Sequence, residues 1–172
     1  KEEEKTKHEV IEEDDSTDPD HLEDLLNVEI IELEVGYGLV NLVDSEQNGD
    51  LLERITHIRK QFALDWGVII PSVKIRDNLE LKPGGYVIKV KGIEIAEGEL
   101  VSDHFLAMDP GTVIEKIEGV ETKEPVFGLP AVWITEDQKE NAQYNGYTVV
   151  DLATVVATHL TEILKTNLHE IF

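Results

Sequence analysis

The clearest alternation of apolar and polar residues lies at the end of the chain. From residue 151 onward, apolar side chains recur at intervals of three and four positions: Leu152, Val155, Val156, Leu160, Ile163, Leu164, Leu168 and Ile171. This spacing places them on one face of a helix expected over residues 151–172, with Asp151 as its N-cap. The same periodicity predicts a second amphipathic helix over residues 50–66, which Gly67 ends.

Shorter apolar stretches predict strands. Residues 28–34 alternate between apolar and charged side chains, which is typical of a strand with one solvated face. Lys91 and Gly92 form a suitable turn between two further strands. The remaining expected elements are strands over residues 39–43, 68–75, 86–90, 93–96, 105–108, 131–134 and 147–150, and a helix over residues 135–144 capped by Thr135. Strands and helices intermix, so the fold class is α/β or α+β, in two small units.

The stretch EPVFGLPAVWI, residues 124–134, does not fit either periodicity. Pro125 and Pro130 each remove a backbone donor, so its first half cannot be an interior strand. Gly128 allows a sharp turn, and Phe127 therefore lies on a stiff turn. Such an aromatic either fills a core or lines a surface dimple, and residue type alone favours the core.

The net charge of −22 is concentrated at the start of the chain, where residues 1–34 contain fifteen acidic and three basic side chains. Residues 1–27 are interpreted as a flexible acidic linker, with a short helix from Pro19 that presents Leu22, Leu25 and Leu26 on one face. No basic patch supports nucleic-acid binding. The sequence also contains no apolar run near the ~20 residues needed to span a bilayer.

Motifs for catalysis or metal binding are absent from the sequence or incomplete. Ser102, Asp103 and His104 are consecutive, so their side chains point to different faces and cannot form a catalytic triad. The six histidines include no pair at a spacing of four. Residues 44–50 resemble the start of a calcium loop, but Ile55 stands where the bidentate Glu is required. The residues therefore predict a non-enzymatic interaction domain without a cofactor. A divalent-metal site formed by Asp44, Asn48 and Asp50 is the alternative.

Several strings, taken together and in order, resemble one family. They are EVGYGLVNLVD, GDLLERITHIRKQF, VKIRDN, DPGT, PVFG and VVATH. They are similar to the cytoplasmic region of the flagellar type III secretion export-gate family (the FlhA family), over residues 34–172. The resemblance implies a first domain of residues 28–102 plus 152–172, a second domain of residues 103–151 inserted into it, and the acidic linker 1–27. It also implies a larger protein, with a membrane channel and further domains.

The resemblance further implies a function and its residues. The family forms a nonameric ring at the cytoplasmic face of the bacterial inner membrane. The ring docks export chaperones with their cargo and passes substrates to the channel. The positions that match its functional residues are Pro110, Glu124, Phe127 and Thr158 for chaperone binding, Gly36 for domain movement, and Leu22, Leu25 and Leu26 for docking on a neighbouring subunit.

On this resemblance, Phe127 becomes the floor or rim of a docking dimple and Glu124 its polar edge, while Trp133 keeps a core position. A structural ring segment that binds no chaperone is a further alternative.

Overall fold

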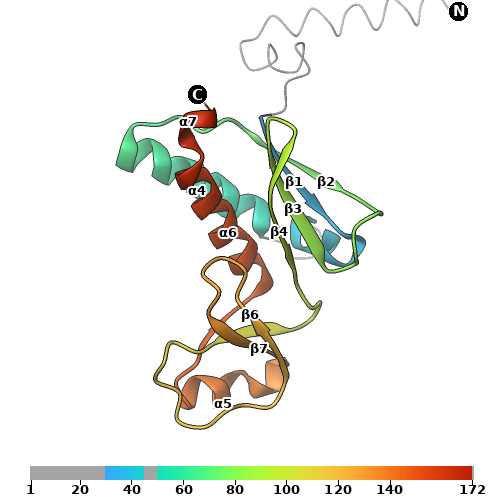
Figure 1. Ribbon diagram of the computed structural model, residues 1–172, viewed down its shortest axis with the longest axis vertical. Helices are drawn as coiled ribbons and strands as arrows, with labels where there is room; N and C mark the ends of the chain where they lie inside the picture. The colour runs from blue at the N-terminus through green and yellow to red at the C-terminus, as the bar shows by residue number, and fades with distance from the viewer. Residues whose placement is uncertain (1–29, 45–49, 172) are drawn as a thin grey trace, which may run out of the picture.

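Two four-stranded sheets and the helices packed against them make up the described part of this computed structural model, residues 30–44 and 50–171 (Figure 1). The elements in chain order are β1 (Ile31–Val35), η2 (Tyr37–Leu39), α3 (Val40–Val43), α4 (Leu51–Trp66), β2 (Val73–Asp77), β3 (Gly85–Val90), β4 (Ile93–Glu99), β5 (Phe105–Met108), β6 (Val120–Lys123), β7 (Pro130–Ile134), η4 (Glu136–Gln138), α5 (Lys139–Tyr144), β8 (Thr148–Val150), α6 (Leu152–Thr166) and α7 (Leu168–Ile171).

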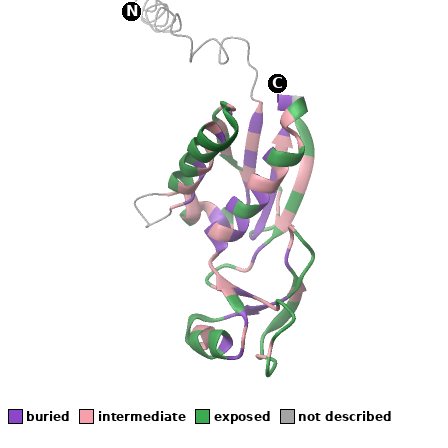
Figure 2. Cartoon of the chain, turned by 90° about the vertical axis from the view of Figure 1, so that its left-hand side faces the viewer, coloured by how far each residue is buried: buried purple, intermediate pink, exposed green. Residues whose placement is uncertain are grey.

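The first sheet has the strand order β2-β1-β3-β4. Strands β1 and β2 are parallel and are connected through α4, whereas β3 and β4 form an antiparallel hairpin. Alternate residues of β1 and β3 share one face because side chains alternate along a strand. The buried side chains of this face are Ile31, Leu33, Val35, Tyr86, Ile88 and Val90, and they belong to one core with the apolar sides of α4 and α6. Figure 2 shows the buried residues gathered between the sheet and these helices.

The opposite face of the first sheet carries charged side chains of both signs. Glu34 accepts hydrogen bonds from Asn78 Nδ2 at 2.9 Å and from Lys89 Nζ at 3.0 Å. Next to it, Glu32 pairs with Arg76 at 3.4 Å. The hydrogen bond from Asn78, followed by that from Lys89, lowers the pKa of Glu34 below its ordinary value of 4.5.

The lowered pKa of Glu34 predicts a dependence of stability on pH. A carboxyl group whose pKa is depressed by folding stabilises the protein above its unfolded pKa, and this contribution is lost as the pH falls. We expect Glu34→Gln to lower the free energy of unfolding at pH 7 and to reduce its further loss between pH 7 and pH 4. Urea unfolding at both pH values, with exposed Glu80→Gln as control, measures this. Equal losses on acidification in wild type and Glu34→Gln would contradict the prediction.

The second sheet has the order β6-β7-β5-β8, and all its strands are antiparallel. Both of its faces are apolar. One face carries Leu106, Ala131 and Trp133, which belong to the core of the first sheet and α6. The other face carries Ala107, Val132 and Ile134, which form a small separate core with Ala142 of α5 and Tyr147. The second sheet therefore lies between α5 and the larger core.

The structure confirms the expected C-terminal end of α4 and the expected N-terminal end of α6. Gly67 follows α4 with a φ of 67°, and its N–H donates to Ala63 O. Asp151 caps α6, where its Oδ1 accepts the Thr154 N–H at 2.8 Å. The turn between β3 and β4 lies at Lys91 and Gly92, both with positive φ, as expected.

Two expected elements were wrong, and the last expected helix is divided into two. Residues 39–43 are helical, because short apolar runs do not distinguish a strand from a helical turn. The strand predicted over 68–75 begins only at Val73 and is a partly exposed edge strand. Only Ile70 of the preceding residues is fully buried. The helix expected over residues 151–172 forms α6 and α7, with Asn167 between them. The N–H and the Nδ2 of Asn167 both donate to Ile163 O, at 3.0 and 2.9 Å.

Among the described residues, no helix is both long and apolar enough to cross a membrane.

Candidate functional site

The loop that joins β6 to β7, residues 124–129, is closed by its own backbone. Glu124 N–H donates to Leu129 O at 2.8 Å, and Gly128 N–H donates to Glu124 O at 2.9 Å. Gly128 has a φ of 73°, a conformation that glycine adopts without the cost of a side chain. Pro125 stands at a loop position that needs no N–H for this closure. The sequence thus builds a short, rigid turn at the end of a hairpin.

The side chain of Glu124 fixes the same loop from within. It is only 4% exposed, and its oxygens accept the N–H groups of Val126 and Phe127. Two donors that would otherwise be unpaired in the turn are thereby satisfied. As a result, Phe127 is held at the tip of the loop, and 61% of its surface is exposed.

Beneath this loop lies an apolar depression with a cavity volume of about 200 Å³, which we call the dimple. It lies where the second sheet meets α6. Its walls come from the loop, from the ends of β5 and β8, and from the first half of α6. The lining residues are Met108, Glu124, Val126, Phe127, Leu129, Val150, Thr154, Val155 and Thr158.

Three of the four predicted chaperone-binding residues line the dimple, namely Glu124, Phe127 and Thr158. Pro110 is exposed and is not among the lining residues. The interpretation of Phe127 from residue type as a core aromatic is wrong, because the closed loop turns its ring toward solvent. Trp133, in β7, is 5% exposed and lies in the larger core, as expected.

Glu124 was expected to form the polar edge of the dimple, but its side chain is buried. Its oxygens face the loop backbone, so its first effect is on the shape of the turn. Glu124 also acts electrostatically on a buried pair formed by Tyr86 and His159, in which the Tyr86 hydroxyl lies 2.7 Å from His159 Nδ1. Burial raises the pKa of Tyr86, and Glu124 raises it further. Burial lowers the pKa of His159, an effect that Glu124 opposes.

The remaining lining residues were not predicted from the sequence. Thr154 lies one helical turn before Thr158, and this spacing was the available signal for it. Val126 and Leu129 flank Phe127 and Gly128, so their place in the same turn also pointed to them. Met108 and Val150 carried no such signal, because their positions depend on the pairing of β5 with β8.

The other predicted positions lie away from the dimple or outside the described residues. Gly36 is buried next to the loop at Lys82 and Pro83. Leu22, Leu25 and Leu26 lie outside the described residues, and so does Asn48 of the alternative metal site. Within residues 30–44 and 50–171, no group of three or more His, Asp or Glu side chains is arranged to hold a metal ion.

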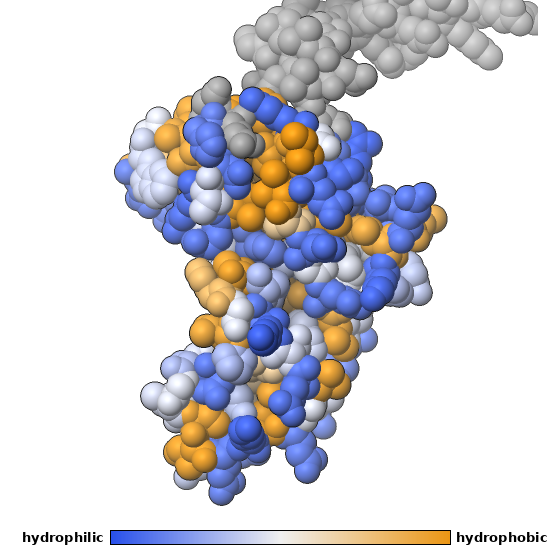
Figure 3. All heavy atoms as spheres, in the orientation of Figure 1, coloured by the Kyte–Doolittle hydropathy of each residue, from blue (hydrophilic) through white to orange (hydrophobic). Residues whose placement is uncertain are grey.

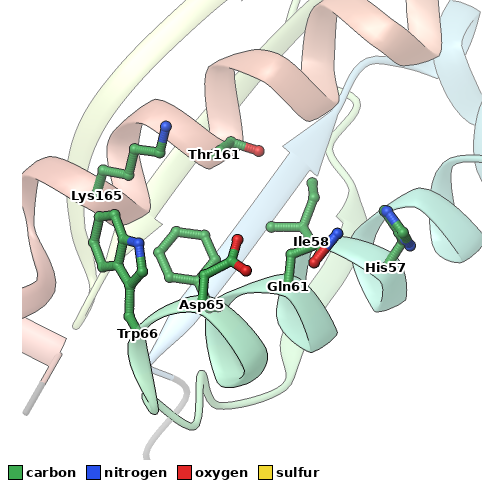
Figure 4. Close-up of a pocket in the computed structure, with 8 residues that line it drawn as sticks. His57, Ile58, Gln61, Asp65, Trp66, Thr161 and Lys165 are labelled. Atoms are coloured by element: carbon green, nitrogen blue, oxygen red, sulfur yellow. The ribbon is translucent and has the colours of Figure 1, made fainter.

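A second cavity of about 310 Å³ lies between the C-terminal halves of α4 and α6 (Figure 4). Trp66 and Lys165 stand at one end of it and His57 at the other. Trp66 also packs edge-on against Phe62, with 5.3 Å between the ring centroids. Figure 3 shows exposed hydrophobic residues in separate groups, over the upper and the lower parts of the molecule, with hydrophilic residues between them.

Two α/β units that share a core make up a fold that is also found in solved structures of other proteins. CdsV of Chlamydia pneumoniae superposes with a TM-score of 0.66 at 19% identity, covering 83% of this chain and 43% of CdsV. The nonameric SctV-C of EPEC superposes with a TM-score of 0.53 at 16% identity, covering 83% of this chain and 41% of SctV-C.

The chain belongs to the FHIPEP family, whose family model matches residues 1–172. The flagellar biosynthesis protein FlhA of Bacillus subtilis is 52% identical over 167 residues. That alignment covers 95% of this chain but only 25% of the Bacillus subtilis protein. The chain thus spans about a quarter of the length of this relative.

Proposed function

We propose that this chain is a docking part of a flagellar type III export gate, and that its dimple binds export chaperones together with their cargo. The observation that carries the proposal is the exposed ring of Phe127, which a closed loop holds at the edge of an apolar depression. Membership of the FHIPEP family and the identity to a flagellar biosynthesis protein support the role in flagellar export.

The geometry of the dimple suits an amphipathic helix. Aromatic side chains that are exposed but rigid lose little conformational entropy when a partner covers them, and such residues dominate the energetics of many interfaces. The loop hydrogen bonds supply this rigidity in advance. Thr158 is exposed on α6 and offers a hydroxyl beside the apolar lining. A partner helix therefore finds an aromatic anchor and a hydroxyl group on facing walls.

The rest of the proposal concerns the whole gate. The chain would lie on the cytoplasmic face of the bacterial inner membrane and pass cargo toward a membrane channel formed by other parts of the protein. Copies of the chain would stand side by side in a ring, which the nonameric assembly named for SctV-C supports by analogy of fold. Residues 22–26 would dock on a neighbouring copy, and Gly36 would serve the movement between the two units.

We expect Phe127→Ala to weaken binding of a purified flagellar chaperone–cargo complex by about 30-fold, because a central aromatic anchor contributes about 2 kcal/mol. Isothermal titration calorimetry measures the change. The variant should keep the wild-type unfolding midpoint, since the ring is mostly exposed.

Tyr144→Ala is the matched control, because Tyr144 is 83% exposed on α5 and is not a lining residue of the dimple. It should bind like wild type. Equal affinity of Phe127→Ala and wild type, with both proteins folded, would favour the alternative of a structural ring segment that binds no chaperone.

A further inference from the structure

A second depression adjoins the dimple along α6. We call it the acidic groove; its lining residues are Asp50, Glu53, Arg54, His57, Ile58, Thr154, Ala157, Thr158 and Thr161, and its cavity volume is about 380 Å³. Thr154 and Thr158 line both the groove and the dimple. These two threonines lie one turn apart on α6, so they form the common wall between an apolar compartment and a polar one.

Among the described residues that line the groove, Arg54 is the only Lys or Arg, and carboxylates already bind it. Arg54 lies 3.1 Å from Asp50 Oδ2 and 3.2 Å from Asp151 Oδ2, and its Nη1 donates to Thr154 Oγ1 at 2.7 Å. These contacts hold the guanidinium against the wall. Asp50 and Asp151 share this guanidinium, and Lys139 also acts electrostatically on Asp151.

Glu53 adds a second carboxylate to the groove lining, which thus holds two carboxylates and one guanidinium. It is exposed on the first turn of α4 and forms no ion pair with the part of the chain that the structure describes. The groove therefore presents negative charge beside an apolar dimple.

We infer that the acidic groove selects the partner of the dimple by charge, so that the docked segment is an amphipathic helix with a basic side chain about one turn from its apolar anchor. This inference rests on the proposed docking function of the dimple. Residues three or four positions apart on a helix share one face. A helix whose apolar anchor enters the dimple thus places its basic side chain in the acidic groove, on the other side of Thr154 and Thr158.

The negative charge of the groove also disfavours residues 1–34 of this chain as the segment that binds there. Residues 1–34 contain fifteen acidic and three basic side chains, so they would meet the groove with like charge. Like charges across an interface disfavour association, whereas opposite charges accelerate it and fix the orientation of the partner. A helix of a separate partner that carries an apolar anchor and a basic side chain matches both the apolar dimple and the acidic groove.

Two labelled helical peptides test the inference on the full chain. Both carry the same apolar face, and their polar faces carry Lys in one peptide and Glu in the other. Fluorescence anisotropy at 50 mM salt should give the Lys peptide an affinity about tenfold higher. This preference should shrink at 300 mM salt, because exposed charges are then screened. Glu53→Lys should weaken the Lys peptide about fivefold, as expected for an exposed pair that becomes a repulsion.

Glu97→Lys is the matched control, since Glu97 is an exposed acid on β4 outside the groove and the charge change is the same. It should leave the preference unchanged. If Phe127→Ala weakens both peptides but wild type does not discriminate between them, the charge inference is overturned and the dimple stands. If Glu97→Lys changes the preference as much as Glu53→Lys does, the selection is not local to the groove, which also overturns the inference. Unchanged binding of both peptides to Phe127→Ala would instead count against the dimple itself.

Discussion

Trp133→Ala is expected to lower the free energy of unfolding by about 4 kcal/mol, because truncating a buried Trp removes its apolar contacts and leaves a cavity. Trp133 is 5% exposed and lies opposite Leu106 in the second sheet. Both side chains belong to the core that also contains α6 and the first sheet. The truncation therefore weakens the contact between the two sheets. Urea unfolding followed by far-ultraviolet circular dichroism measures the loss.

The same substitution at the other tryptophan provides the comparison. Trp66 is 51% exposed and packs edge-on against Phe62. Trp66→Ala should cost about 1 kcal/mol, the scale of one aromatic pair. Similar losses for the two variants would show that Trp133 does not connect the sheets in the way that its burial indicates.

Gly36→Ala is expected to destabilise the fold by about 3 kcal/mol, because a side chain at this position has no space. An added Cβ would lie 2.0 Å from Lys82 O and 2.7 Å from Pro83 O. The backbone of Gly36 is in an ordinary extended conformation, with a φ of −70°, so the cost arises from the close approach of the 82–83 loop. The N–H of Gly36 also donates to Gly85 O at 2.8 Å, which holds the two segments together.

Gly85→Ala is a milder test of the same loop. Its added Cβ would come no closer than 3.3 Å to Lys82 O, a distance that a small shift relieves. We expect a loss of about 1 kcal/mol or less by chemical denaturation. A loss for Gly36→Ala as small as that for Gly85→Ala would mean that the loop yields easily. The proposed role of Gly36 would then have to come from backbone flexibility.

The two long helices could be predicted because their signals are local. The apolar spacing of α4 and α6, the cap at Asp151 and the stop at Gly67 all lie within a few residues of the element that they define. Residues 39–43 and 68–72 lacked such signals. The conformation of these residues depends on partners that are distant in the sequence. For example, the N–H of neighbouring Gly38 donates to Pro83 O.

The candidate site also combines features that the local sequence predicts with features that it does not predict. Its turn could be predicted from two prolines and a glycine, but the exposure of Phe127 could not be predicted from residue type. Exposure depends on the hydrogen bonds that close residues 124–129, and on the burial of Glu124 beneath the turn. The role of Arg54 was missed for a related reason, since its partner Asp151 lies 97 positions away.

The position of α6 in both the chain and the core has a consequence for the order of events during synthesis. α6 follows both sheets in the sequence, yet its side chains complete the inner face of the first sheet and one face of the second. A chain that emerges from the ribosome in order thus exposes both faces until about residue 164 is available. Contacts between distant residues form slowly, and incomplete apolar faces favour misassembly. We expect the two sheets to reach their final packing late and together, when this helix docks.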